Sequence, residues 1–218
     1  MEKTLSAIAQ NLDLMLGGLG VTLVLSVLII FFGTIIGFLG GMGLTSGPRW
    51  LKALLRVYVD IVRGTPLLVL MFLLFYLMPE FGVDITGFQT VVVALSLFAG
   101  AHISEIVRGA LTGIPKGQAD AAKALGLTYW PMMREIMIPQ AMPAVVPPWT
   151  NTAIEMVKGT SLAFLLSVSD LLFETQNVVE RTGIALPFYF TAALIYLAVN
   201  LLLSRFGHWL EQRNRYAA

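Results

Sequence analysis

The chain has 218 residues, of which 57% are hydrophobic and 12% charged, and its mean hydropathy is +0.80. Soluble domains carry about 25% charged residues, so this composition excludes a soluble enzyme and indicates an integral membrane protein. The formal net charge of +1 arises from charges spread along the chain, which argues against nucleic acid as a partner. The sequence contains no cysteine, so disulfides and thiolate metal sites are excluded as well.

The N-terminal part of the chain predicts a first membrane span that is not cleaved. Acidic residues lie on both sides of Lys3, and the apolar run that follows is too long for a signal-peptide core. Residues 14–48 carry no charge, and a helix needs roughly 20 apolar residues to cross the hydrocarbon core. We expect one long span over about 14–44. Within it, Gly33 and Gly37 form a small-xxx-small pattern that allows a second helix to approach closely.

Basic residues then alternate with apolar ones at helical spacing over residues 49–63. This pattern predicts an amphipathic stretch on the membrane surface whose cations reach the lipid headgroups. It runs into a second expected span at about 59–78. Glu80 and Asp84 then form a short acidic loop, and the next apolar run predicts a third span at about 85–107.

Residues 116–139 are polar, prone to form helix, and set between apolar runs. Several alanines favour a helix over the first half, Gly126 can end it with a left-handed residue, and Thr128 can cap a second helix. We therefore predict a helix, a sharp turn and another helix, here called the elbow. Because Ala and Gly carry little side chain, the elbow can lie closely in a groove on another protein. A connecting loop without a partner is the alternative.

The fourth apolar segment, at about 140–168, contains Pro143, Pro147 and Pro148. Prolines free backbone carbonyls, which membrane spans tolerate mainly where the backbone faces protein or a water-filled path. We therefore predict that this segment lines a path. After a polar, acidic stretch, residues 182–204 form the fifth and last expected span.

Glu155 and Lys158 lie within the fourth expected span, where ionisable groups are costly and usually face a cavity or a partner. On one reading they neutralise each other, because they lie three residues apart on one helix face. On the other reading they border a substrate path together with nearby polar residues. The path residues are then Asn151, Glu155, Lys158, Thr160 and Ser161.

Positive charge is unevenly distributed between the two sides of the expected spans. The first connecting stretch, the elbow and the C-terminal tail hold eleven Lys and Arg residues, whereas the other side carries only Lys3 and Arg181. The positive-inside rule then places the elbow and the C-terminus in the cytoplasm and the N-terminus outside. We expect an all-α integral membrane fold of about five transmembrane helices, with the elbow as a cytoplasmic coupling-helix loop between spans 3 and 4.

The spacing of residues in the elbow resembles the EAA loop of permease subunits in bacterial ABC importers. That loop has an acidic residue and two alanines, then a glycine, and later an apolar residue followed by proline. The matching residues here are Asp120, Ala121, Ala122, Gly126, Ile136, Ile138 and Pro139. Asp120 stands where the family usually has Glu, and Ile138 where it usually has Leu; both changes keep the charge or the polarity.

Two further segments resemble the amino-acid branch of these permeases, which covers uptake of histidine, glutamate, glutamine, arginine and opines. One is Arg-Gly-Thr-Pro at residues 63–66. The other is an Asn…Lys-x-Thr-Ser-Leu stretch that begins at Asn151, although Gly159 stands where an acid is frequent and Glu155 is not expected. These departures leave the solute open, since Glu155 favours a cationic amino acid and Lys158 an acidic one.

The resemblance implies that residues 1–218 form a single ABC importer transmembrane domain in the bacterial inner membrane. It implies a cytoplasmic ATPase dimer, a second permease subunit, identical or paralogous, an extracytoplasmic solute-binding protein, an amino-acid substrate and surrounding lipid. It also implies that the elbow couples ATP hydrolysis to alternating access. The coupling residues are then Gly117, Gln118, Asp120, Ala121, Ala122, Leu125 and Gly126.

The sequence predicts no catalytic chemistry of its own. It has no G-x-x-x-x-G-K-[ST] phosphate loop, so we expect ATP and Mg²⁺ to be bound by the partner ATPase and no cofactor by this chain. His102 and His208 are far apart and lack metal-ligand spacing. The alternative function is a self-sufficient, proton-coupled secondary transporter or channel that uses His102, Glu105 and Glu155.

Overall fold

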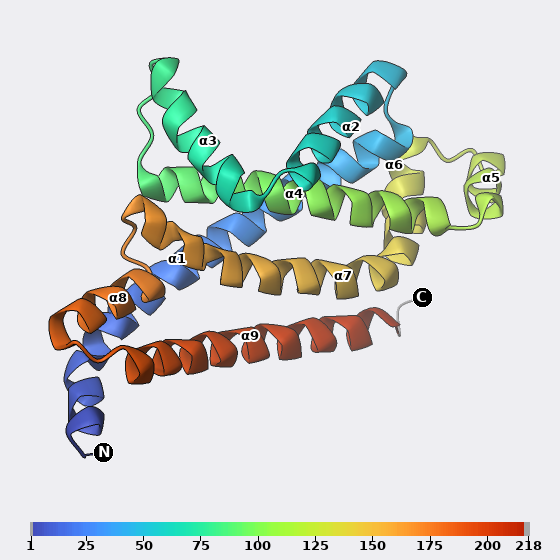
Figure 1. The fold of residues 1–218 in the computed structure, drawn as a ribbon. Coiled ribbons are helices and arrows are strands. Elements are labelled where there is room, and N and C mark those ends of the chain that lie inside the picture. The colour runs from blue at the N-terminus through green and yellow to red at the C-terminus, as the bar shows by residue number, and fades with distance from the viewer. Residues whose placement is uncertain (1, 216–218) are drawn as a thin grey trace.

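The computed structural model describes the backbone of residues 2–215, and side chains from residue 6 to residue 213. Within this part of the chain every regular element is a helix, as Figure 1 shows. The elements are α1 (Glu2–Ser46), α2 (Arg49–Gly64), α3 (Leu67–Glu80), α4 (Gly87–Gly113), α5 (Lys116–Ala124), α6 (Tyr129–Met132), the π turn η1 (Met133–Met137), α7 (Ile138–Gly159), the 3₁₀ turn η2 (Thr160–Leu166), α8 (Leu171–Thr182) and α9 (Ala185–Arg215).

Three helices in this part of the chain, α1, α4 and α9, are each long and apolar enough to cross a membrane. Two further pairs pass the same test only together: α2 with α3, and the segment 129–166 with α8. The structure therefore has three candidate spans, or up to five if each bent pair is one span. Figure 1 places α5 and the C-terminal end of α9 at one end of the bundle, and α8 with the start of α1 at the other.

The second expected span, 59–78, is not a continuous helix. α2 and α3 meet at an angle of 111°, and Thr65 and Pro66 lie between them. Thr65 is extended, with φ −107° and ψ 136°, because the residue before a proline is pushed away from helical angles. α2 and α3 form an open V beside α4 (Figure 1).

α1 packs lengthwise against α4 through its glycines. A Cβ at Gly33 would lie 2.7 Å from the Cβ of Ala99, and a Cβ at Gly41 would lie 2.6 Å from that of Val107. Gly37 faces Ile103 in the same way. The small-residue pattern predicted in the first span thus brings together two helices of the same chain, where any larger residue would force them apart.

The elbow forms as a helix, a turn and a second helix. α5 ends in a Schellman motif, in which Leu127 N–H bonds to Ala122 O over 3.1 Å and Gly126 N–H bonds to Lys123 O over 2.9 Å. Gly126 has φ +77°, which is the predicted left-handed conformation. Thr128 occupies the N-cap position of α6, but its side chain makes no capping hydrogen bond.

A wide turn joins the elbow to α7. Over Met133–Met137 the helix is a π-helix, closed by a bond from Ile138 N–H to Met133 O. Pro139 follows immediately and cannot donate to the carbonyl four residues earlier, so a regular α-helical turn is unfavourable here. Met133 is buried in the main hydrophobic core and anchors the turn.

At the opposite end, a buried carboxylate fixes the start of α8. Asp170 is fully buried; its Oδ1 accepts a bond from Phe173 N–H at 2.9 Å and its Oδ2 one from the Tyr196 hydroxyl at 3.1 Å. Leu171 N–H donates to Thr22 Oγ1 over 3.1 Å. α8 is thereby tied to both α1 and α9.

Candidate functional site

One face of α7 is exposed and largely polar over the whole length of the helix. We call it the α7 stripe, and its residues are Gln140, Ala144, Asn151, Glu155 and Lys158. Their spacings of three, four and seven residues place them on one side of an α-helix. The other side is apolar and buried, with Val145, Val146, Ala153, Met156 and Val157 in contact with the rest of the bundle. A helix of this length spans about 33 Å, so the α7 stripe reaches from the elbow to the opposite end of the bundle.

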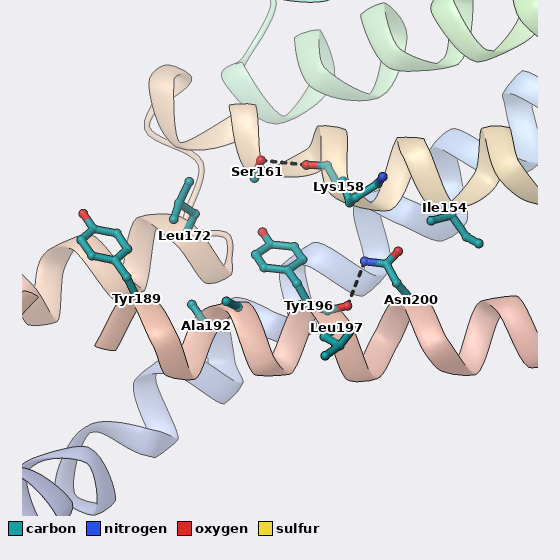
Figure 2. A pocket seen from close by; sticks show the side chains of 10 residues that line it. Ile154, Lys158, Ser161, Leu172, Tyr189, Ala192, Tyr196, Leu197 and Asn200 are labelled. Atoms are coloured by element: carbon teal, nitrogen blue, oxygen red, sulfur yellow. Dashed lines mark hydrogen bonds between the residues drawn. The ribbon is translucent and has the colours of Figure 1, made fainter. Parts of the chain in front are cut away.

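Cavities border the α7 stripe on both sides. Between α7 and α9 lies a cavity of about 560 Å³, lined by Lys158, Ser161, Tyr189, Tyr196 and Asn200 among others (Figure 2). Between α4 and α7, near the elbow, lies a second one of about 470 Å³. Its lining includes Glu105, Gly109, Gln140, Ala144 and Pro148.

The path residues predicted from the sequence fall into two groups. Asn151, Glu155 and Lys158 are exposed on the α7 stripe, and Ser161 lines the larger cavity while its hydroxyl donates to Lys158 O over 2.7 Å (Figure 2). Thr160 is fully buried, and its hydroxyl donates to Val157 O over 2.7 Å. The structure thus brings four of the five together on the accessible side and places Thr160 in the core.

Glu155 and Lys158 do not neutralise each other within the chain. Among the described side chains, no Lys158 nitrogen lies within 4.0 Å of a Glu155 carboxylate oxygen. In Figure 2 the Lys158 side chain runs along α7 in the direction of Ile154. Both charges are therefore open to a partner outside the chain.

The prolines of α7 add backbone polarity to the stripe. Pro148 has no N–H and cannot donate to the carbonyl of Ala144, which is an exposed residue of the stripe. The Thr152 hydroxyl donates to Pro148 O over 3.1 Å. A carbonyl without its helical donor, beside Asn, Glu and Lys side chains, makes this face suited to a hydrated solute rather than to lipid.

The predicted coupling residues lie in the elbow, at the end where the α7 stripe begins. Six of the seven are exposed, and Leu125 is 80% exposed. Ala122 is the exception, because only 1% of it is exposed. Six of the seven positions are thus available to another protein.

A charged cluster that the sequence did not reveal ties α2 to α4. Glu105 accepts bonds from Arg56 Nη1 and Arg108 Nη2, each at 2.8 Å. The side chain of Glu105 is 16% exposed, against 44% for Arg56. The spacing of three residues on one helix is enough to predict the pairing of Glu105 with Arg108. Arg56 lies 49 residues away, and only the fold brings it close.

Comparison with known proteins places this arrangement among transport proteins. The family described as "Binding-protein-dependent transport system inner membrane component" matches residues 29–216. The chain is 38% identical over 204 residues to the L-cystine transport system permease protein TcyB of Bacillus subtilis (strain 168), covering 93% of this chain and 87% of that protein. It is 34% identical over 215 residues to the glutamine transport system permease protein GlnP of Escherichia coli (strain K12), covering 98% of each.

A solved structure has the same fold. It is described as "Crystal structure of an amino acid ABC transporter with histidines" and superposes with a TM-score of 0.85 at 29% sequence identity. The match covers 94% of this chain and 96% of the other. The helical arrangement around the α7 stripe is therefore shared with a transmembrane transport subunit.

Proposed function

Since this chain belongs to the family of binding-protein-dependent transport system inner membrane components, we propose that it is the permease subunit of an ABC importer for amino acids. It is a multi-pass protein of the inner membrane. The observation that carries this function is the α7 stripe, a polar face on a helix that belongs to one of the candidate membrane spans. Exposed Asn, Glu and Lys side chains are costly in lipid and are retained where they line a path.

The α7 stripe and the cavities beside it form the path for the solute. An amino acid carries an ammonium and a carboxylate group, and Glu155 and Lys158 offer one complementary charge to each. The relatives are named for glutamine and L-cystine, which carry both groups. We assign Asn151, Glu155, Lys158 and Ser161 to the path, and Thr160 to the packing that supports it.

The elbow is the coupling element. Its exposed small residues, together with Leu125, form the surface that receives a cytoplasmic ATPase, which binds the ATP and Mg²⁺. Lys and Arg are concentrated at this end of the bundle, so it faces the cytoplasm and the N-terminus lies outside. Closure of the ATPase dimer moves the elbow, and the permease pair alternates between inward-open and outward-open states. A solute-binding protein delivers the amino acid at the outer end.

A proton-coupled transporter that works alone fits the side-chain contacts less well. Glu105 is engaged by two arginines and is not free to exchange protons readily. His102 Nδ1 lies 2.9 Å from Phe98 O, and its ring lies 4.5 Å from the Phe98 ring, as expected of a packed histidine. The three residues of the supposed proton path therefore do not form a connected chain of free groups.

Reconstitution into liposomes tests the proposed function. The chain is purified with the ATPase, solute-binding protein and any second permease encoded beside it, and uptake of labelled amino acids is measured with and without ATP. Uptake that needs ATP and the binding protein supports the proposal. Uptake by the chain alone, driven by a proton gradient, would overturn it.

A further inference from the structure

Helix α2 has three faces of different character. Its packed face lies against the bundle, where the Tyr58 hydroxyl donates to Leu97 O over 2.6 Å. The other two faces are wholly or partly exposed. The apolar face consists of Trp50, Leu54, Val57 and Ile61, and the basic face consists of Arg49, Lys52, Arg56, Asp60 and Arg63. Spacings of three and four residues place each set on one side of the helix.

Among the described residues, nothing covers the apolar face of α2. Its four side chains are between 55% and 69% exposed, and they follow one line over about 16 Å. The basic face beside it holds four basic residues and one acidic residue, Asp60, which leaves a charge of +3. An apolar face that contains Trp, next to a face rich in Lys and Arg, is typical of a helix that lies in the membrane interface.

Three cations lie in the first two turns of α2. Arg49 makes no ion pair or hydrogen bond through its side chain within the part of the chain that the structure describes. Lys52 Nζ donates to Thr45 O at the end of α1 over 2.8 Å. Arg56 Nη1 lies 2.8 Å from Glu105 Oε1, yet its side chain is 44% exposed. Since Lys has three donors and Arg five, all three side chains can still donate to an anion.

The start of α2 lies toward the end of the bundle that carries the elbow. In Figure 1, α2 begins and α1 ends on the same side as α5. Glu105, which Arg56 contacts, lines the cavity near the elbow. This is the cytoplasmic end in the orientation proposed above, and the cytoplasmic leaflet carries anionic lipid headgroups. The cations and the apolar face of α2 thus meet a leaflet of complementary charge.

We propose that α2 binds an anionic phospholipid from the leaflet beside the elbow. Arg49, Lys52 and Arg56 hold the phosphate of the headgroup, and the acyl chains lie along the apolar face. Arg56 then bridges the lipid phosphate and the Glu105 carboxylate, which links the lipid to α4. The site lies outside the solute path, so this inference goes beyond the proposed function.

Quenching by spin-labelled lipid tests the site directly. Because the natural chain contains no cysteine, Leu54→Cys carries a single nitrobenzoxadiazole fluorophore on the apolar face of α2. Leu201→Cys carries it on the exposed face of α9 as the control. The complete transporter, with cysteine-free partner subunits, is placed in phosphatidylcholine membranes. Phosphatidylglycerol with a doxyl group on its acyl chain should quench position 54 at a lower mole fraction than doxyl-labelled phosphatidylcholine does, whereas both should quench position 201 alike.

Removal of charge tests the basic face, with Arg56 left unchanged. Each basic residue near an anionic leaflet raises the affinity about fivefold, so Arg49→Gln with Lys52→Gln should weaken the preference for phosphatidylglycerol by more than about tenfold. Arg49→Lys with Lys52→Arg keeps both charges and should keep the preference. Arg205→Gln with Arg213→Gln removes the same charge from exposed residues of α9 and should not change the quenching at position 54.

Four results would overturn the proposal. Equal quenching of position 54 by both lipids would show an ordinary lipid-facing surface, and no quenching by either would show that another subunit covers the apolar face. Loss of the preference with inorganic phosphate, but not with chloride at the same ionic strength, would assign the cations to free phosphate. An equal loss in the α9 control would show a general effect of charge. Quenching needs no transport, so the lipid site and the proposed function can fail independently.

Discussion

Gln140, the first residue of the α7 stripe, donates a hydrogen bond from Nε2 to Oε1 of Gln118 in the elbow over 3.2 Å. The two residues lie 22 positions apart, on either side of the turn at Gly126. This bond connects the part of the chain assigned to the ATPase with the helix assigned to the solute. A displacement of α5 therefore reaches α7 through a direct side-chain contact as well as through the backbone.

Gln140→Leu keeps the size of the side chain and removes this bond, so we expect weaker coupling. An exposed neutral hydrogen bond contributes about 0.5–1.5 kcal/mol, which corresponds to a loss of about two- to tenfold in uptake per ATP hydrolysed. The loss of coupling is measured as the ratio of uptake rate to ATPase rate in liposomes. Gln118→Leu should cause a similar loss, and the double variant no further loss. Additive losses would show that the two residues act independently.

Gly126→Val should uncouple ATP hydrolysis from uptake. The position has φ +77°, which costs a residue with a Cβ about 1–2 kcal/mol, and a β-branched residue more. Gly126→Asn is the control, since Asn tolerates the left-handed conformation. We expect uptake to fall with Val and to be largely kept with Asn at equal membrane levels. Uptake by the Val variant at the wild-type rate would show that this turn is not needed for coupling.

Glu155→Gln should change which amino acids are taken up. The amide keeps the shape and removes the negative charge, so cationic substrates should lose the most, with a rise in KM that exceeds the fall in kcat. A panel of labelled amino acids in cells with the complete transporter measures this, and Glu80→Gln, an exposed acid at the end of α3, is the control. An unchanged panel would place selectivity in the binding protein.

Glu105→Gln should lower the thermal stability of the purified protein. It breaks two ion pairs and leaves Arg108 and Arg56 without a counter-charge, which we expect to cost about 1–2 kcal/mol. For a chain of this size, 1 kcal/mol corresponds to about 2–4 °C in Tm. Arg56→Gln should cost less, because that side chain is 44% exposed. Equal Tm values for wild type and Glu105→Gln would show that the cluster is not stabilising.

Gly33→Ala should destabilise the packing of α1 on α4. The added methyl group would meet the Cβ of Ala99 at 2.7 Å, and overpacking of this kind costs about 1–3 kcal/mol. Gly20→Ala adds the same methyl group to the same helix where nothing lies within 4 Å. We expect Gly20→Ala to keep or raise Tm in detergent. A fall that is equal for both variants would indicate a general effect on helix α1.

Local patterns in the sequence were sufficient for much of this fold. The uncharged run after residue 14, the left-handed turn at Gly126 and the close packing through Gly33 depend on neighbouring residues or on a single helix face. The break at Thr65 and Pro66 carried a local signal too, since proline follows threonine, but the apolar residues after it favoured one continuous span.

Tertiary contacts decided what the sequence left open. In the sequence, Thr160 is surrounded by polar residues. The change from α7 to the 3₁₀ turn rotates its side chain into the core, where its hydroxyl donates a hydrogen bond to Val157 O. The contact between Arg56 and Glu105 depends on how α2 crosses α4, which no periodicity encodes. For Glu155 and Lys158 the spacing allowed an internal pair, and the rotamers of the folded chain do not form it.

The π turn at Met133–Met137 has a consequence for changes in chain length. A π turn holds one residue more than the α-helical turn it replaces, so deletion of one residue there keeps the orientation of α7, at the cost of the one hydrogen bond that Pro139 cannot donate. A deletion within α7 would instead rotate everything beyond it by about 100° and carry Glu155 and Lys158 off the accessible face. The π turn between the elbow and the α7 stripe is thus the place where relatives of different length can gain or lose a residue. Such a change leaves the same charged side chains facing the solute.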